Sequence, residues 1–165
     1  MAAMAWARDM LGFGAAAPKT AQEHSRQHHS PTLIPKLKAE HGELLKLYSE
    51  IEKLAVDGMY ASIPAALAAF KSKFDLHTLN ENLHFYCYIE RKLAGNDDDE
   101  GMIRSFRTEM NAIARGVVNF VKKYRMNGVR PSNGHDFLTE LRQVGSLLIH
   151  RVEREETELY LMYTP

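Results

Sequence analysis

Hydrophobic residues recur at steps of three and four along the chain from Pro31 to Tyr163. This period places them on one face of an α-helix, and no alternating pattern typical of β-strands competes with it. The period breaks near Gly58, near Gly95 and over residues 127–134, where glycine, proline and asparagine gather. Such residues usually mark turns. The pattern therefore predicts four amphipathic helices joined by short connections.

The expected helices span residues 31–56, 62–95, 99–126 and 136–163. Four consecutive helices with short turns bury their apolar faces most simply in an up-down-up-down arrangement. We therefore expect an all-α fold, an antiparallel four-helix bundle, over residues 31–165. Residues 1–30 are rich in alanine and show no sustained period, so we expect them to form a flexible N-terminal arm.

Length and charge exclude several classes of function. A chain of 165 residues suits one domain. Its 21 Lys and Arg residues balance 21 Asp and Glu residues, so it lacks the basic surplus that binding to nucleic acid requires. The single cysteine, Cys87, permits no intrachain disulfide, and no apolar run approaches the about 18 residues of a membrane span. We expect a cytoplasmic protein that binds neither nucleic acid nor membranes.

Polar residues at positions where the helical period demands apolar ones are the most informative feature. His41 interrupts the first stretch, His77 and Glu81 the second, and Arg151 and Glu155 the fourth. A buried charge is costly unless it is paired or bound to a metal. Reflecting the chain about its turns brings these residues to similar depths, which indicates one shared polar site in the bundle core.

Two chemical interpretations of this site stay open. His77 and Glu81 are four residues apart, so they point the same way from adjacent turns, about 6 Å apart along the axis. With His41 and Glu155 they form a candidate ligand set for a metal ion, with iron preferred and manganese or zinc as alternatives. Alternatively, Arg151 supplies the positive charge of a metal, and the site is a hydrogen-bonded network that binds no cofactor.

The second and fourth stretches share one spacing, in which three residues separate His77 from Glu81 and Arg151 from Glu155. With the lone His41 in the first stretch, this spacing makes residues from about 33 to 163 resemble the hemerythrin-like (HHE) cation-binding domain family. The resemblance implies a non-haem di-iron site, used for oxygen binding or for iron and oxygen sensing. It also implies that His41, His77, Glu81 and Glu155 are metal ligands.

The chain departs from the family pattern at two places. Arg151 replaces the histidine of the last motif, and the third stretch offers Met110 and Ile113 where the family has a further histidine. Two histidines are too few for a standard oxygen-carrying centre. The resemblance therefore implies a degenerate metal site with a sensing or regulatory role, and it favours a protein that is not an enzyme.

Short segments also resemble a second family. Residues 74–76, 82–86, 141–145 and 151–156 are similar to the regulators of sigma D. Those proteins are helical bundles that bind the primary sigma factor and need no metal. This similarity implies the alternative function, a metal-free interaction protein with a partner such as a sigma factor.

Overall fold

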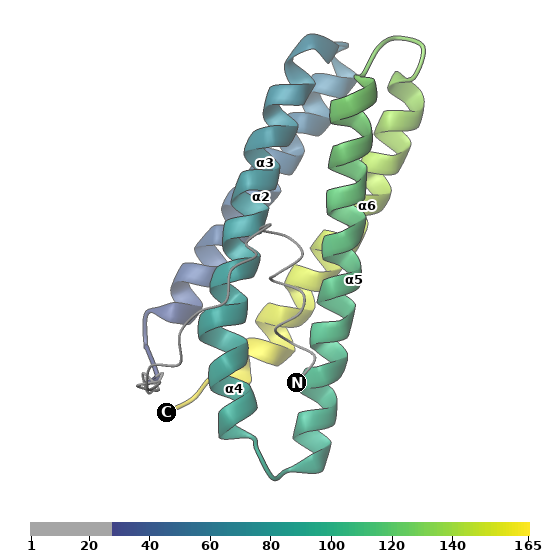
Figure 1. The fold of residues 1–165 in the computed structure, drawn as a ribbon. Coiled ribbons are helices and arrows are strands. Elements are labelled where there is room, and N and C mark those ends of the chain that lie inside the picture. Colours follow the sequence, from purple (N-terminus) through teal and green to yellow (C-terminus); the bar gives the residue numbers. More distant parts are fainter. Residues whose placement is uncertain (1–27) are drawn as a thin grey trace, which may run out of the picture.

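The computed structural model describes residues 28–165 and folds them into a helical bundle, with no β-strand in that range. Two π-helical segments, η2 and η3, continue the second and fourth long helices, so that α3, η2 and α4 form one rod (Figure 1). In chain order the elements are α2 (Leu33–Val56), η1 (Tyr60–Ser62), α3 (Ile63–Asn80), η2 (Glu81–Tyr86), α4 (Cys87–Lys92), α5 (Asp97–Asn127), α6 (Gly134–Arg154), η3 (Glu155–Leu159) and η4 (Tyr160–Met162).

The four long helices pack as neighbours around a square. Helix α2 contacts α3 and α6, and α5 contacts the same two helices. Consecutive helices run antiparallel, because short connections join them end to end (Figure 1). The predicted all-α four-helix bundle is confirmed. No helix within residues 28–165 is long and apolar enough to cross a membrane, and the arm expected over residues 1–30 lies almost wholly outside the described range.

Local sequence explains where helix α5 begins and ends. Asn96 precedes the helix in an extended conformation, and its side chain accepts a hydrogen bond from the backbone N–H of Asp99 at 3.4 Å. The helix therefore begins at Asp97, two residues before the expected position, with four acidic residues in its first turn. It ends at Asn127, and the Gly128 that follows has a φ of 69°, a value that favours glycine.

This cap leads to a first prediction. Replacing Asn96 with alanine removes the capping acceptor and is expected to lower the free energy of unfolding by about 1 kcal/mol. Urea unfolding followed by circular dichroism measures the change. Asn119, which is exposed within the same helix, is the matched control. Its change to alanine should leave stability unchanged or slightly higher, because alanine favours helix; an equal loss from both variants would contradict the capping role.

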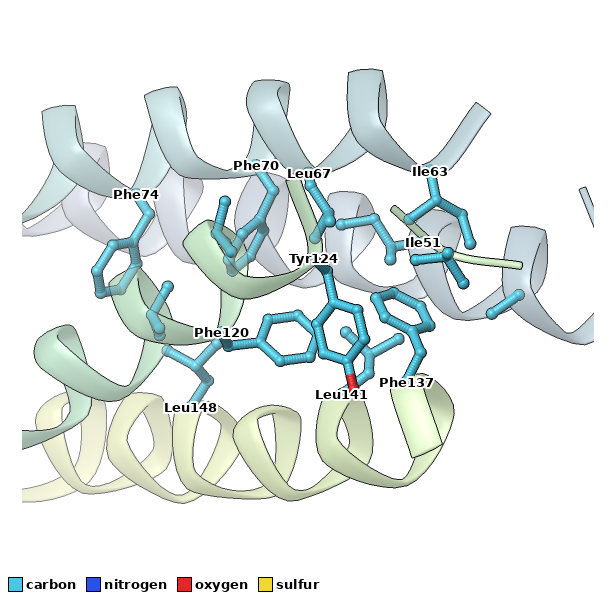
Figure 2. Packing of buried hydrophobic residues seen from close by; sticks show 14 of the residues in the cluster. Ile51, Ile63, Leu67, Phe70, Phe74, Phe120, Tyr124, Phe137, Leu141 and Leu148 are labelled. Carbon is cyan, nitrogen blue, oxygen red and sulfur yellow. The ribbon is translucent and has the colours of Figure 1, made fainter. Parts of the chain in front are cut away.

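The hydrophobic core is divided into two clusters. The larger one fills the end of the bundle near the α2–α3 and α5–α6 connections, where Figure 2 shows Leu67, Phe120 and Phe137 packed between helices. The smaller one includes Leu37 and Phe85 and lies at the other end, with the C-terminus of the chain. On α2, on the α3 rod and on the α6 rod, buried polar residues lie between the two clusters.

The π-helical segments explain why the expected apolar stripes fail near the helix ends. A π-turn holds one residue more than an α-turn, so it shifts the phase of everything that follows. The uniform period places Tyr88 and Met162 in the core, but both are only partly buried. The residues one position later, Ile89 and Tyr163, are buried instead.

Candidate metal centre

Five polar side chains, which we call the polar layer, are each no more than 2% exposed. They are His41, His77, Glu81, Arg151 and Glu155. Atoms of His41, His77 and Glu155 that can ligate a metal all lie within 4.8 Å of one another. Glu81 lies beside this group, where Tyr160 donates a hydrogen bond to its Oε1 at 3.1 Å. The structure thus brings three of the four candidate ligands into one cluster, with the fourth adjacent.

The two histidines are each oriented by a carboxylate from outside the layer. His41 Nδ1 lies 2.8 Å from Glu156 Oε1, and His77 Nδ1 lies 3.0 Å from Glu40 Oε2. An ionised carboxylate can only accept a hydrogen bond, so each Nδ1 donates. In neutral imidazole this leaves Nε2 with a free lone pair. Both rings therefore present a potential metal-binding nitrogen toward the centre of the layer.

Glu155 is held in the same way. Its Oε1 accepts a hydrogen bond from Arg151 Nε at 2.6 Å, while its Oε2 faces His41 Nε2 at 3.1 Å. With Nδ1 of His41 already donating to Glu156, a neutral ring would place two lone pairs against each other across this gap. A positive charge between them, either a proton or a metal ion, removes the repulsion.

Unsatisfied atoms concentrate in this layer. Within residues 28–165, the buried side-chain nitrogen and oxygen atoms without a hydrogen-bond partner are His77 Nε2, Glu81 Oε2, Glu155 Oε2 and Arg151 Nη1. An unsatisfied buried polar group costs about 1–3 kcal/mol, and such groups are rare in folded proteins. The first three are lone-pair atoms of metal-ligand types. This donor set fits a bound cation.

The pKa values of the two histidines shift in opposite directions. Burial lowers the pKa of His41, but the Glu155 and Glu156 carboxylates more than reverse this effect, so its pKa is raised overall from 6.5. Burial and the neighbouring His41 lower the pKa of His77. His77 is therefore neutral at neutral pH, the form that binds a metal.

The two glutamates of the layer shift in opposite directions. Burial and the adjacent Glu155 raise the pKa of Glu81 well above 4.5. Burial acts to raise the pKa of Glu155, but the hydrogen bond from His41 and the charge of Arg151 lower it overall. In the metal-free protein these shifts keep Glu155 ionised at neutral pH and favour the protonated form of Glu81. A cation bound by Glu81 would displace that proton.

Comparison with known families agrees with this geometry. The model of the hemerythrin HHE cation-binding domain matches residues 32–163. The chain belongs to this family. Searches of the curated proteins and of the solved structures gave no significant match. The predicted HHE resemblance is thus confirmed, whereas the similarity to regulators of sigma D stays a prediction.

Within this HHE domain, other titratable residues lie outside the cluster. His84 and His150, which flank the motifs, are both exposed. Helix α5 contributes Glu109, which accepts a hydrogen bond from Arg154 at 2.6 Å and lies 4.0 Å from Arg151. At the depth of the layer, α5 otherwise presents apolar side chains such as Phe106. The candidate ligands of this HHE domain therefore come from three helical rods.

Sequence reasoning missed the outer partners Glu40, Glu156, Tyr86 and Tyr160. Glu40 and Glu156 are the immediate neighbours of His41 and Glu155, and each contacts a histidine on a different helix. A residue adjacent to a core position lies about 100° around the helix, at the edge of the buried face. Their position beside a predicted core residue was the signal that the sequence offered, because a neighbouring helix packs against the edge of the buried face.

Proposed function

We propose that this HHE domain binds non-haem iron in its polar layer, through Nε2 of His41, Nε2 of His77, and the carboxylates of Glu81 and Glu155. One observation carries the proposal. His77, Glu81 and Glu155 each have one polar atom held by a partner and a second, unpartnered lone-pair atom within the buried layer, and Nε2 of His41 faces Glu155 Oε2 at 3.1 Å. This arrangement is typical of metal ligands that are oriented by outer hydrogen bonds.

The donor chemistry suits iron, and also manganese or zinc. Two imidazoles and two carboxylates form the mixed nitrogen and oxygen set that these divalent ions share. Bound iron would supply redox chemistry, while the protein contributes ligand orientation and a dry, charged surrounding. Because the donors are buried between two hydrophobic clusters, the ion also stabilises the folded bundle. A stability that follows metal supply supports a sensing or regulatory role rather than a catalytic one.

Elemental analysis tests the proposal directly. Protein purified without chelator or affinity-tag metal is incubated anaerobically with ferrous iron, desalted and analysed, and its thermal unfolding is compared with that of chelated protein. We expect retained iron and a higher melting temperature, with manganese and zinc as comparison ions. Protein without iron whose melting is insensitive to chelator would mean that Arg151 holds the layer together. The function would then lie on the surface, with a protein partner such as a sigma factor.

The outer carboxylates provide a second test. Replacing Glu40 or Glu156 with alanine frees Nδ1 of His77 or of His41 and is expected to lower iron affinity by about 10–100-fold. Competition against a chelating indicator measures the affinity. Glu43 lies on the same helix as Glu40 but pairs with Lys73 at the surface, so its change to alanine should leave the affinity unchanged. Equal losses from all three variants would contradict the orienting role.

A further inference from the structure

Arg151 lies at the position in α6 that His77 occupies in α3. Three residues separate Arg151 from Glu155, as three separate His77 from Glu81, and each glutamate begins a π-helical segment. The two rods are therefore equivalent in local geometry as well as in spacing. By this equivalence, the Arg151 side chain enters the polar layer at the place where a histidine of the α6 motif would otherwise lie.

The guanidinium of Arg151 is fixed on several sides. Its Nε donates to Glu155 Oε1 at 2.6 Å, and its Nη2 donates to the hydroxyl of Tyr86 at 2.7 Å. Its Cζ lies 5.2 Å from the centre of the Phe106 ring. The side chain is 1% exposed, so the charge cannot leave the layer without breaking these contacts. These contacts fix Arg151 in the bundle core.

We propose that the Arg151 guanidinium takes the place of a second metal ion, so that the polar layer holds one ion. With a histidine at position 151 as well as at position 77, the layer would hold two ions. This inference rests on the proposed function. A guanidinium stays charged and has no lone pair to offer a metal. It also uses Glu155 Oε1, which leaves only Oε2 of that carboxylate for an ion. A second cation would meet a fixed positive charge in a medium that screens it weakly.

The donors that remain match a single ion. The Nε2 atoms of His41 and His77 and the unpartnered oxygens of Glu81 and Glu155 are four potential ligand atoms. A second ion would need ligands from α5, but Glu109 there is held by Arg154. The arrangement thus supplies one coordination sphere and one permanent positive charge.

Iron stoichiometry of the intact protein and of the variant Arg151→His tests this inference. We expect about one iron per chain in the wild type and about two in Arg151→His, which restores the second histidine. Arg142→His is the matched control, because Arg142 lies on the same helix but is exposed and pairs with Glu52 at the surface, so its replacement should leave the stoichiometry at the wild-type value. Circular dichroism verifies that each variant is folded.

The outcomes separate this inference from the proposed function. Two irons per chain in the wild type would confirm iron binding but overturn the proposed role of Arg151. One iron per chain in both the wild type and Arg151→His would have the same meaning. No iron in the wild type with iron in Arg151→His would refute both the proposed function and the one-ion layer, because the guanidinium would then replace every metal ion. No iron in either protein would overturn both.

If the variant does not fold, electron paramagnetic resonance of the ferric wild type decides, since an isolated high-spin ion supports the inference and a coupled pair refutes it.

Discussion

Replacing His77 with alanine should lower the affinity for ferrous iron by more than about 100-fold. This loss exceeds the one expected when only an outer hydrogen-bond partner of a ligand is removed. His77 supplies one of the two imidazole nitrogens in the layer, and its Nε2 has no other partner among the described residues. Iron at about 100 times its Kd should stabilise the wild type by about 2.7 kcal/mol. In the variant at the same iron concentration, most of this gain should vanish.

Calorimetric titration gives the affinity, and thermal melts with and without iron give the gain in stability. His84→Ala is the matched control, since His84 is exposed on the segment that follows. It should bind iron as the wild type does. A His77→Ala protein that retains full iron content would remove His77 from the ligand set.

Glu81→Gln should have opposite effects on stability and on iron binding. In the metal-free protein, burial and the adjacent Glu155 raise the pKa of Glu81, so folding favours a carboxyl that carries a proton. Glutamine resembles the protonated carboxyl and needs none. We expect the metal-free variant to be more stable than the wild type by about 1 kcal/mol or more near neutral pH. Its iron affinity should nevertheless fall sharply, because an amide is a poor substitute for a carboxylate ligand.

The pH dependence follows from the direction of the shift. A carboxyl whose pKa is higher in the folded than in the unfolded state binds more protons when folded, so its contribution to stability declines as pH rises. The decline begins near the unfolded value of about 4.5 and continues toward the folded pKa. The stability difference between Glu81→Gln and the wild type should therefore be small near pH 4.5 and larger at neutral pH.

Urea unfolding in the presence of chelator, at several pH values, measures this difference. Glu153→Gln, which replaces an exposed side chain, is the matched control and should change stability little. If Glu81→Gln destabilises the metal-free protein at every pH, then Glu81 is ionised in the fold and the account of the layer given above is wrong.

The bundle itself could be predicted from the sequence, because long helices with one apolar face leave few ways to pack. The same period also identified His41, His77 and Arg151, since a polar residue in an apolar stripe is visible without a structure. The HHE resemblance added the cation-binding expectation that the family match supports. These predictions rest on patterns within single helices.

What could not be predicted depends on contacts between helices or on irregular turns. The segments η2 and η3 contain no glycine or proline, so no local breaker predicts the π-turns that shift Tyr86 and Tyr160 into the core. The pairing of Glu40 with His77 depends on how closely α2 and α3 approach. The hydrophobic pattern of one helix contains no information about the π-turns or about the distance between two helices.

The division of the core into two clusters bears on how quickly the protein can take up or release a metal. A charged layer interrupts the continuity of apolar packing, so the two ends of the bundle can behave as separate units of local unfolding. The smaller cluster, which includes Leu37 and Leu159, closes the layer at the end where the chain terminates. We expect this end to open first. The frequency of that opening, rather than diffusion of the ion, would then set the rate of metal exchange.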